Sequence, residues 1–137
     1  MKTAIIYATK TKHSKKLAEA IASALNLEAK NMTENPDLQD TSFLFIVSGI
    51  YGGVSMPALL DYIKNLKAPL LKKAAIVTSC ASGKQKQVEL HRILEEKGIQ
   101  VIDEFVCKGN FLFVAIKHPN DKDLQNAIEF ARKVLAN

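Results

Sequence analysis

The segment from Thr9 to Ser14 combines hydroxyl groups and positive charge in a position suited to binding an anion. It follows the apolar run 4–8, and it precedes a stretch in which Leu17, Ile21 and Leu25 recur at helical spacing, so it is predicted to join a strand to a helix. The first N–H groups of a helix lack partners and carry the positive end of its dipole. A phosphate would accept hydrogen bonds from these N–H groups and would be attracted by the dipole, and the hydroxyl groups could act as further donors.

Positive charge is concentrated around this loop. Residues 8–16 contain four lysines and His13 but no acid. Neither G-x-G-x-x-G nor the Walker pattern G-x-x-x-x-G-K-[ST] is present, which argues against the dinucleotide and P-loop classes of site. An alternative interpretation is that Ser14 only caps the helix and that the lysines form solvated surface.

Two further loops could contact a flat ligand. Residues 48–54 contain three glycines within five positions, which allows close backbone approach, and Tyr51 offers a ring for stacking. The alternative is a flexible connection whose tyrosine packs on the next helix. Residues 79–83 form the third loop, where backbone groups could contact the ligand.

The two cysteines allow a different chemistry. Cys80 could be a nucleophile activated by a helix N-terminus, as in small phosphatases with a C-x5-R loop. Position 86 is Lys, which lacks the planar bidentate grip of arginine on phosphate, so this interpretation is disfavoured. Cys107 is predicted to be a buried strand residue, and both cysteines are expected to be free thiols.

The elements that would position these loops alternate along the chain. Apolar runs predict strands at 4–8, 27–32, 43–47, 74–78 and 99–107. Helical spacing predicts helices from Ser14, over 56–66 with Pro57 in the first turn, over 88–97 closed by Gly98, and over the last residues from Leu124. This alternation predicts an α/β fold, a three-layer α/β/α sandwich with a five-stranded parallel sheet. In such folds the ligand binds at the carboxyl ends of the strands.

Composition narrows the class of protein. A chain of 137 residues, 47% hydrophobic and 24% charged, is expected to form one domain over 1–137. No apolar run is long enough for a membrane span and no signal segment is visible, so a cytoplasmic protein is expected. A net charge of +5 favours anionic partners, but a basic stripe with interleaved aromatics is missing, so nucleic acid is not expected. No spacing indicates a metal site or paired catalytic carboxylates.

Two segments resemble the flavodoxin family. Residues 7–18, Tyr-Ala-Thr-Lys-Thr-Lys-His-Ser-Lys-Lys-Leu-Ala, look like the flavodoxin opening T/S-x-T-G-x-T/S ahead of the first helix. Residues 105–109 followed by 118–124 resemble the closing segments of short flavodoxin-like proteins. The resemblance spans most of the chain and implies strand order 2-1-3-4-5.

The resemblance also implies a cofactor, FMN, with its phosphate in the first loop in contact with Thr9, Thr11 and Ser14. The expected cofactor-binding residues of the three loops are Thr9, Lys10, Thr11, Lys12, His13 and Ser14; Ser48, Gly49, Ile50, Tyr51, Gly52 and Gly53; and Ser79, Cys80, Ala81, Ser82 and Gly83. The flavin would do the chemistry, so no catalytic side chain is expected. An electron carrier that exchanges electrons with a redox partner protein is therefore favoured over a stand-alone oxidoreductase.

The chain departs from the family pattern in two respects. Lys12 stands where the family has glycine, and the chain is basic where flavodoxins are commonly acidic, so its partner need not be the family's usual basic-faced one. Two alternatives stay open. One is a flavin-dependent reductase or oxidase, because residues 48–52 are similar to the S-I-x-Y-G stretch of flavodoxin-like protoporphyrinogen oxidases. The other is a fold without flavin that binds an anion or an anionic partner.

Overall fold

The computed structural model describes residues 2–8, 12–51, 54–80, 84–108 and 120–136. In chain order the elements are β1 (Thr3–Ala8), α1 (His13–Leu25), β2 (Ala29–Asn31), the 3-10 turn η1 (Met32–Glu34), β3 (Phe43–Tyr51), β4 (Val54–Ser55), α2 (Pro57–Lys64), β5 (Lys73–Cys80), α3 (Val88–Glu96), β6 (Gln100–Lys108) and α4 (Asp121–Ala136).

Five of the strands form a parallel sheet in the order β2-β1-β3-β5-β6. The predicted order 2-1-3-4-5 is thereby confirmed, because β5 and β6 are the fourth and fifth strands of that path. The sequence analysis did not anticipate β4, which pairs antiparallel with the end of β3.

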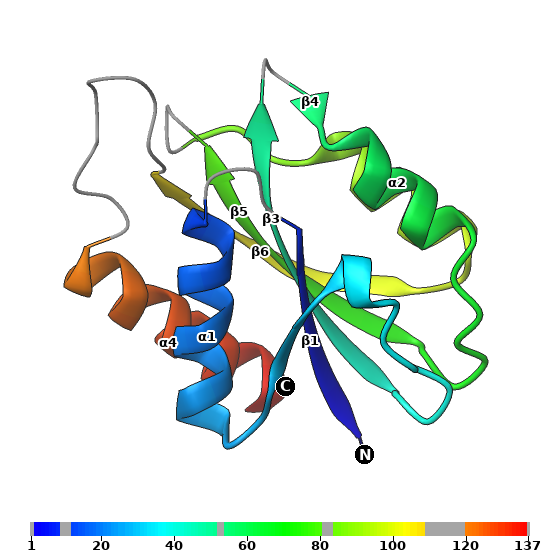
Figure 1. Cartoon of the computed structure of the whole chain (residues 1–137), viewed down its shortest axis with the longest axis horizontal. Coiled ribbons are helices and arrows are strands. Elements are labelled where there is room, and N and C mark those ends of the chain that lie inside the picture. Colours follow the sequence, from blue (N-terminus) through cyan, green and yellow to red (C-terminus); the bar gives the residue numbers. More distant parts are fainter. Residues whose placement is uncertain (1, 9–11, 52–53, 81–83, 109–119, 137) are drawn as a thin grey trace.

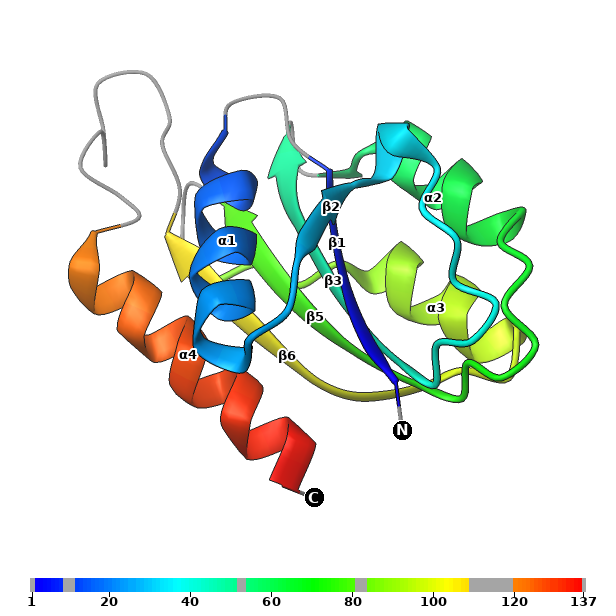
Figure 2. The ribbon, with the colours of Figure 1, turned by 60° about the horizontal axis from the view of Figure 1, so that its bottom comes forward.

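Helices cover both faces of the sheet, which confirms the three-layer α/β/α sandwich. Helices α1 and α4 lie together on one face, and α2 and α3 lie on the other (Figures 1 and 2). Alternate strand residues supply the two cores: Phe45 and Val47 pack toward α1 and α4, whereas Leu44 and Ile46 pack toward α2 and α3. The strands read as continuous apolar runs because both of their faces are buried.

Helix α1 is held by an apolar stripe. Leu17, Ala18, Ile21 and Ala22 are buried at helical spacing, and Ser14 lies on the same stripe one turn earlier. Asn26 ends the helix with a left-handed φ of 58° and donates its N–H to the carbonyls of the last turn.

A buried polar cluster joins β5, β6 and α3. The Glu104 side chain is fully buried; one oxygen accepts from the Thr78 hydroxyl and from the Gln87 N–H at 3.0 Å, and the other lies 2.8 Å from His91 Nε2. The side-chain amide of Gln87 also donates, through Nε2, to Thr78 Oγ1 at 3.1 Å. The carboxylate therefore ties two strands to the beginning of α3.

A β-bulge directs Glu104 to this face. The pairing of β5 with β6 shifts by one residue after Ala74, so that Ala74 pairs with Val101 but Ala75 pairs with Asp103. Simple alternation from Val101 would place Glu104 on the opposite face, since side chains alternate along a strand. The additional residue reverses that placement and turns the carboxylate toward α3.

We expect Glu104→Ala to lower the free energy of unfolding by about 3 kcal/mol, because it removes the acceptor of two buried donors, the Thr78 hydroxyl and the Gln87 N–H, and the contact with the partly exposed His91. Urea denaturation measures the change. The matched control is Glu129→Ala on the exposed face of α4, which should change stability by less than about 0.5 kcal/mol. Equal losses in the two variants would contradict a structural role for the cluster.

Candidate functional site

The sheet brings the ends of three strands to one edge. Ala8 of β1 pairs with Ser48 of β3, and Ser48 pairs with Thr78 of β5. Gly49 and Ser79 form the next pair toward the carboxyl end. The described parts of the three predicted loops therefore begin side by side, and Figure 1 shows this edge with β4 beside it.

Part of the predicted site lies outside the described residues. These residues are Thr9, Lys10, Thr11, Gly52, Gly53, Ala81, Ser82 and Gly83, together with the side chain of Tyr51. The described candidates are Lys12, His13, Ser14, Ser48, Gly49, Ile50, Ser79 and Cys80.

The prediction that the second and third loops begin at Ser48 and Ser79 was wrong. β3 continues to Tyr51, because Ser48 and Gly49 pair with β5 while Ile50 and Tyr51 pair with β4. β5 continues to Cys80, which pairs with Lys108. The predicted second helix is also shorter than expected, since α2 ends at Lys64.

Helix α1 begins after a residue in the left-handed conformation. Lys12 occupies the N-cap position with φ 70°, the left-handed conformation that glycine adopts without strain. A lysine therefore adopts a backbone conformation that favours glycine. Its side chain makes no capping hydrogen bond, and the first helical bond runs from the Lys16 N–H to the Lys12 carbonyl at 3.1 Å.

Ser14 is a buried hydroxyl without a partner. It is 0% exposed, and its Oγ makes no hydrogen bond to any described residue. It lies inside α1 rather than at the N-cap, so the interpretation that Ser14 only caps the helix is wrong. A buried hydroxyl without a hydrogen bond costs free energy, and a ligand that accepts from it would remove that cost.

The electrostatics at this helix end favour an anion. The first turn of α1 contains no acid, and Lys15 and Lys16 are exposed beside it. Burial and then the positive charge of Lys16 lower the pKa of His13 below 6.5, so the unliganded protein holds this imidazole in its neutral form near pH 7. A nearby phosphate would oppose both effects and raise that pKa.

The carboxyl ends of β3 and β5 form a partly apolar side of the candidate site. The Ser48 hydroxyl lies 3.6 Å from Met56 Sδ, and Ile50 is buried beside it. Cys80 is buried, and its Sγ accepts from the Gln85 N–H at 3.4 Å. This wall offers backbone groups and few charges, an arrangement suited to an uncharged aromatic ligand.

The alternative of a nucleophilic Cys80 stays disfavoured, because position 86 is Lys and no helix begins at Cys80 itself. Cys80 is the last residue of β5, whereas α3 begins at Val88. Neither cysteine forms a disulfide, as predicted. Cys107 is buried in β6, which confirms the prediction, and burial, followed by the charge of Asp123, raises its pKa to about 12.

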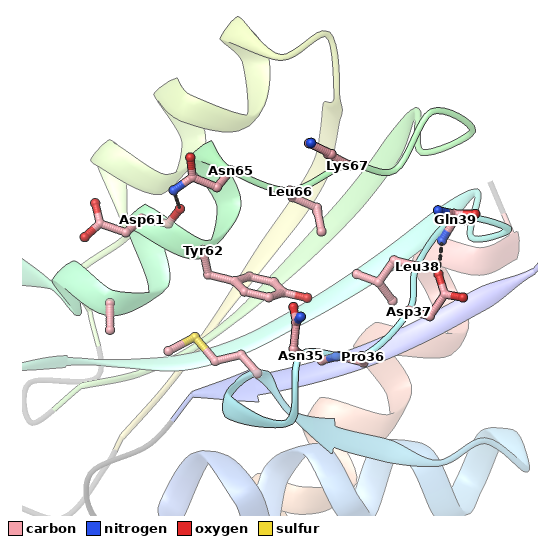
Figure 3. A pocket seen from close by; sticks show the side chains of 12 residues that line it. Asn35, Pro36, Asp37, Leu38, Gln39, Asp61, Tyr62, Asn65, Leu66 and Lys67 are labelled. Atoms are coloured by element: carbon pink, nitrogen blue, oxygen red, sulfur yellow. Dashed lines mark hydrogen bonds between the residues drawn. The ribbon is translucent and has the colours of Figure 1, made fainter.

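Two polar features were not found from the sequence. The Glu104 cluster includes Thr78, the residue before Ser79; the signal for it was the pair of acids Asp103 and Glu104 within the predicted strand 99–107. The other is a hollow of about 610 Å³ between residues 32–39 and α2 (Figure 3). There the Tyr62 ring points toward Asn35; its hydroxyl is buried without a hydrogen bond to any described residue, and burial raises its pKa.

Two features are absent from residues 2–8, 12–51, 54–80, 84–108 and 120–136. No helix in them has both the length and the apolar character required to cross a bilayer. No group of three or more His, Cys, Asp or Glu side chains in the same ranges is arranged to hold a metal ion.

The chain is similar to known proteins in its sequence and in its fold. No family profile matches the chain. The sequence is 30% identical over 151 aligned positions to the uncharacterized protein MJ0298 of Methanocaldococcus jannaschii, covering 100% of both chains. The structure is similar to a flavodoxin from the domain Archaea, with TM-score 0.73 and 17% identity over 98% of this chain and 99% of that one. It is also similar to a flavoprotein in complex with FMN from Lactobacillus acidophilus NCFM, with TM-score 0.53 and 18% identity over 75% of this chain and 91% of that one.

We expect Lys12→Gly to raise the free energy of unfolding by up to about 1 kcal/mol, because relief of the left-handed strain exceeds the added entropy of the unfolded chain. Lys15→Gly is the matched control and should lower it by about 1 kcal/mol, because Lys15 lies within α1. Urea denaturation distinguishes the two. A loss of stability in both variants would show that Lys12 is not strained.

We expect Cys107 to resist alkylation in the folded protein at pH 8. A pKa of about 12 instead of 9.0 lowers the fraction of thiolate by about a thousandfold, and burial blocks access. Mass spectrometry after iodoacetamide treatment, with and without urea, measures the rate. Labelling at one rate under both conditions would contradict the burial of this thiol.

Proposed function

We propose that this chain, which belongs to the same family as the uncharacterized protein MJ0298 and has the flavodoxin-like fold, binds FMN and carries electrons between partner proteins. The FMN would lie at the carboxyl edge of the sheet, across the ends of β1, β3 and β5. Bound FMN supplies the one- and two-electron chemistry, so the protein need only bind, orient and shield it.

The single observation that carries the proposal is the unpartnered hydroxyl of Ser14. It is buried at the beginning of α1, where the positive end of the helix dipole lies and the first turn contains no acid. A phosphate monoester presents several strong acceptors and negative charge, and both match this end of the helix. The left-handed φ of Lys12 supports the same conclusion, because this is the position at which the flavodoxin pattern has glycine.

The other half of the site fits an aromatic ring. Ile50 and Cys80 are buried and uncharged, and Gly49 and Ser79 present backbone at the end of adjacent strands. These groups would exclude water from one side of the ring and contact its polar edge. Cys107 is buried with a raised pKa, and position 86 is Lys instead of the Arg of a C-x5-R loop, so the chemistry is assigned to the cofactor.

Ser14→Ala should change stability and affinity in opposite directions. Without ligand the substitution removes an unsatisfied buried hydroxyl, so the free energy of unfolding should stay equal or rise by about 1 kcal/mol. The affinity for FMN should fall by about tenfold or more, because a hydrogen bond to a charged phosphate is worth about 1.5 to 3 kcal/mol. Fluorescence titration with FMN and urea denaturation measure the two effects.

Ser23→Ala on the exposed face of α1 is the matched control and should leave both quantities unchanged. Riboflavin, which lacks the phosphate, should bind more weakly than FMN and should not distinguish Ser14→Ala from the wild type. In NMR the pKa of His13 should rise when FMN is added, because the phosphate offsets the charge of Lys16. Equal FMN affinity in the wild type and Ser14→Ala would show that the phosphate does not bind at this helix end.

A further inference from the structure

A hollow of about 670 Å³ lies at the amino-terminal edge of the sheet, opposite the edge where FMN is proposed to bind. Its walls are three connections: the segment before β3, the segment from α2 to β5 and the turn from α3 to β6. In Figure 1 these connections lie at the ends of the strands away from their arrowheads. The hollow and the candidate site are therefore separate.

Backbone hydrogen bonds join the three walls. The Lys72 N–H donates to the Ser42 carbonyl at 3.4 Å, which ties the second wall to the first. The Gln100 N–H donates to the Lys72 carbonyl at 2.8 Å, which ties the third wall to the second. The hollow is therefore already formed in the unliganded protein, as ligand sites commonly are.

One ammonium group of the hollow is held in place. Lys97 Nζ donates to the carbonyls of Lys64 and Leu66, at 3.2 and 3.1 Å, where α2 ends. A lysine ammonium has three N–H donors, so one donor remains after these two bonds. Both partners are neutral carbonyls, and the positive charge of Lys97 is not neutralised by them.

The charged side chains that line the hollow are all lysines. They are Lys67, Lys72 and Lys97, and all three are exposed. None of them forms an ion pair with a residue in the described part of the chain. A concave surface lined by one sign of charge concentrates its field and attracts ions of the opposite sign.

The acids nearby do not cancel this charge. The wall segments 39–42, 64–73 and 95–100 contain five lysines and three acids. None of these acids lines the hollow, and Glu96 is already paired on α3. Asp37 and Asp61 line the adjoining hollow of Figure 3, and neither forms an ion pair with Lys67, which borders both.

The inner lining of the hollow is apolar. Leu71 and Ile99 line it and are buried, and the half-buried Leu66 and Ala68 lie beside them. A flat protein surface would meet the lysines but would not reach Leu71 and Ile99. A small molecule that enters the hollow would contact both kinds of group, and the volume is that of a small-molecule site.

We propose that this basic hollow binds a small organic anion, with a compact apolar or aromatic body and one carboxylate, sulfonate or phosphate group. The body would pack on Leu71 and Ile99, and the anionic group would lie among the three ammonium groups. Lysine acts on an anion as a point charge, so the hollow selects charge and apolar size over the geometry of one acid group. This site goes beyond the proposed function, because it lies at the other edge of the sheet.

The test is a fluorescence titration with the apolar anion anilinonaphthalene sulfonate, mapped by amide shifts of the ¹⁵N-labelled protein. The shifts should centre on Leu66, Lys72 and Ile99. Phenylnaphthylamine, which has the same aromatic body without the sulfonate, should bind there at least about tenfold more weakly. Raising the salt from about 20 to 300 mM should weaken binding of the anion by about threefold or more.

Matched variants test the lysines. Lys67→Gln and Lys72→Gln remove one charge each from exposed side chains, and each should weaken binding of the anion about threefold to tenfold. Lys133→Gln makes the same change on the exposed face of α4 and should stay within about twofold of the wild type. The melting temperature of all three variants should match that of the wild type, so that a loss of affinity reports on the hollow.

Three results would overturn the proposal: equal losses in Lys133→Gln, equal affinity for the uncharged analogue, or displacement of the probe by polyglutamate at lower concentration than by free organic anions, which would assign the surface to an acidic protein segment. Saturating FMN should leave the probe in the hollow, and displacement by FMN would overturn a site separate from that of the cofactor. If FMN binds nowhere and the probe shifts appear, the cofactor assignment alone fails. If FMN binds and the probe does not, the basic hollow alone fails.

Discussion

Parallel pairing of β1, β3 and β5 is the constraint on which the rest of this molecule depends. Parallel strands in register must end at one edge, and successive strands can be joined only by crossing over a face of the sheet. Two consequences follow. The helices must cover both faces, which accounts for the two separate cores, and the connections after the strands must gather at one edge. The candidate site is a product of the same pairing that stabilises the fold.

Two buried polar groups near this edge have opposite local environments. Glu104 accepts from Thr78 and Gln87 and contacts His91, so its burial is compensated by several hydrogen bonds. Ser14 is as deeply buried and has no partner among the described residues. Free energy is therefore lost at the helix end proposed to take the phosphate, whereas the carboxylate that joins β5, β6 and α3 is satisfied within the protein.

Backbone strain and exposed apolar side chains occur in the same region of the molecule as the buried Ser14 hydroxyl. The left-handed backbone of Lys12 costs stability, and so does the exposure of Val54 and Val88 to water. All three residues lie around the carboxyl edge of the sheet, where the cofactor is proposed to bind. The large apolar side chains described in β1, β3 and β5 are almost fully buried.

Local patterns in the sequence determined the alternation of strands and helices, the burial of Cys107 and the end of α3 before Gly98. The order of the five strands followed from the family resemblance. Those features depend on periodicity and on the conformational preferences of neighbouring residues, which can be read along one stretch of chain. The tertiary structure alone decided that β3 continues to Tyr51, that a bulge turns Glu104 toward His91, and that Ser14 is buried without a partner. Each of these outcomes depends on pairing or packing between residues far apart in the sequence, and no local pattern records which backbone groups will meet.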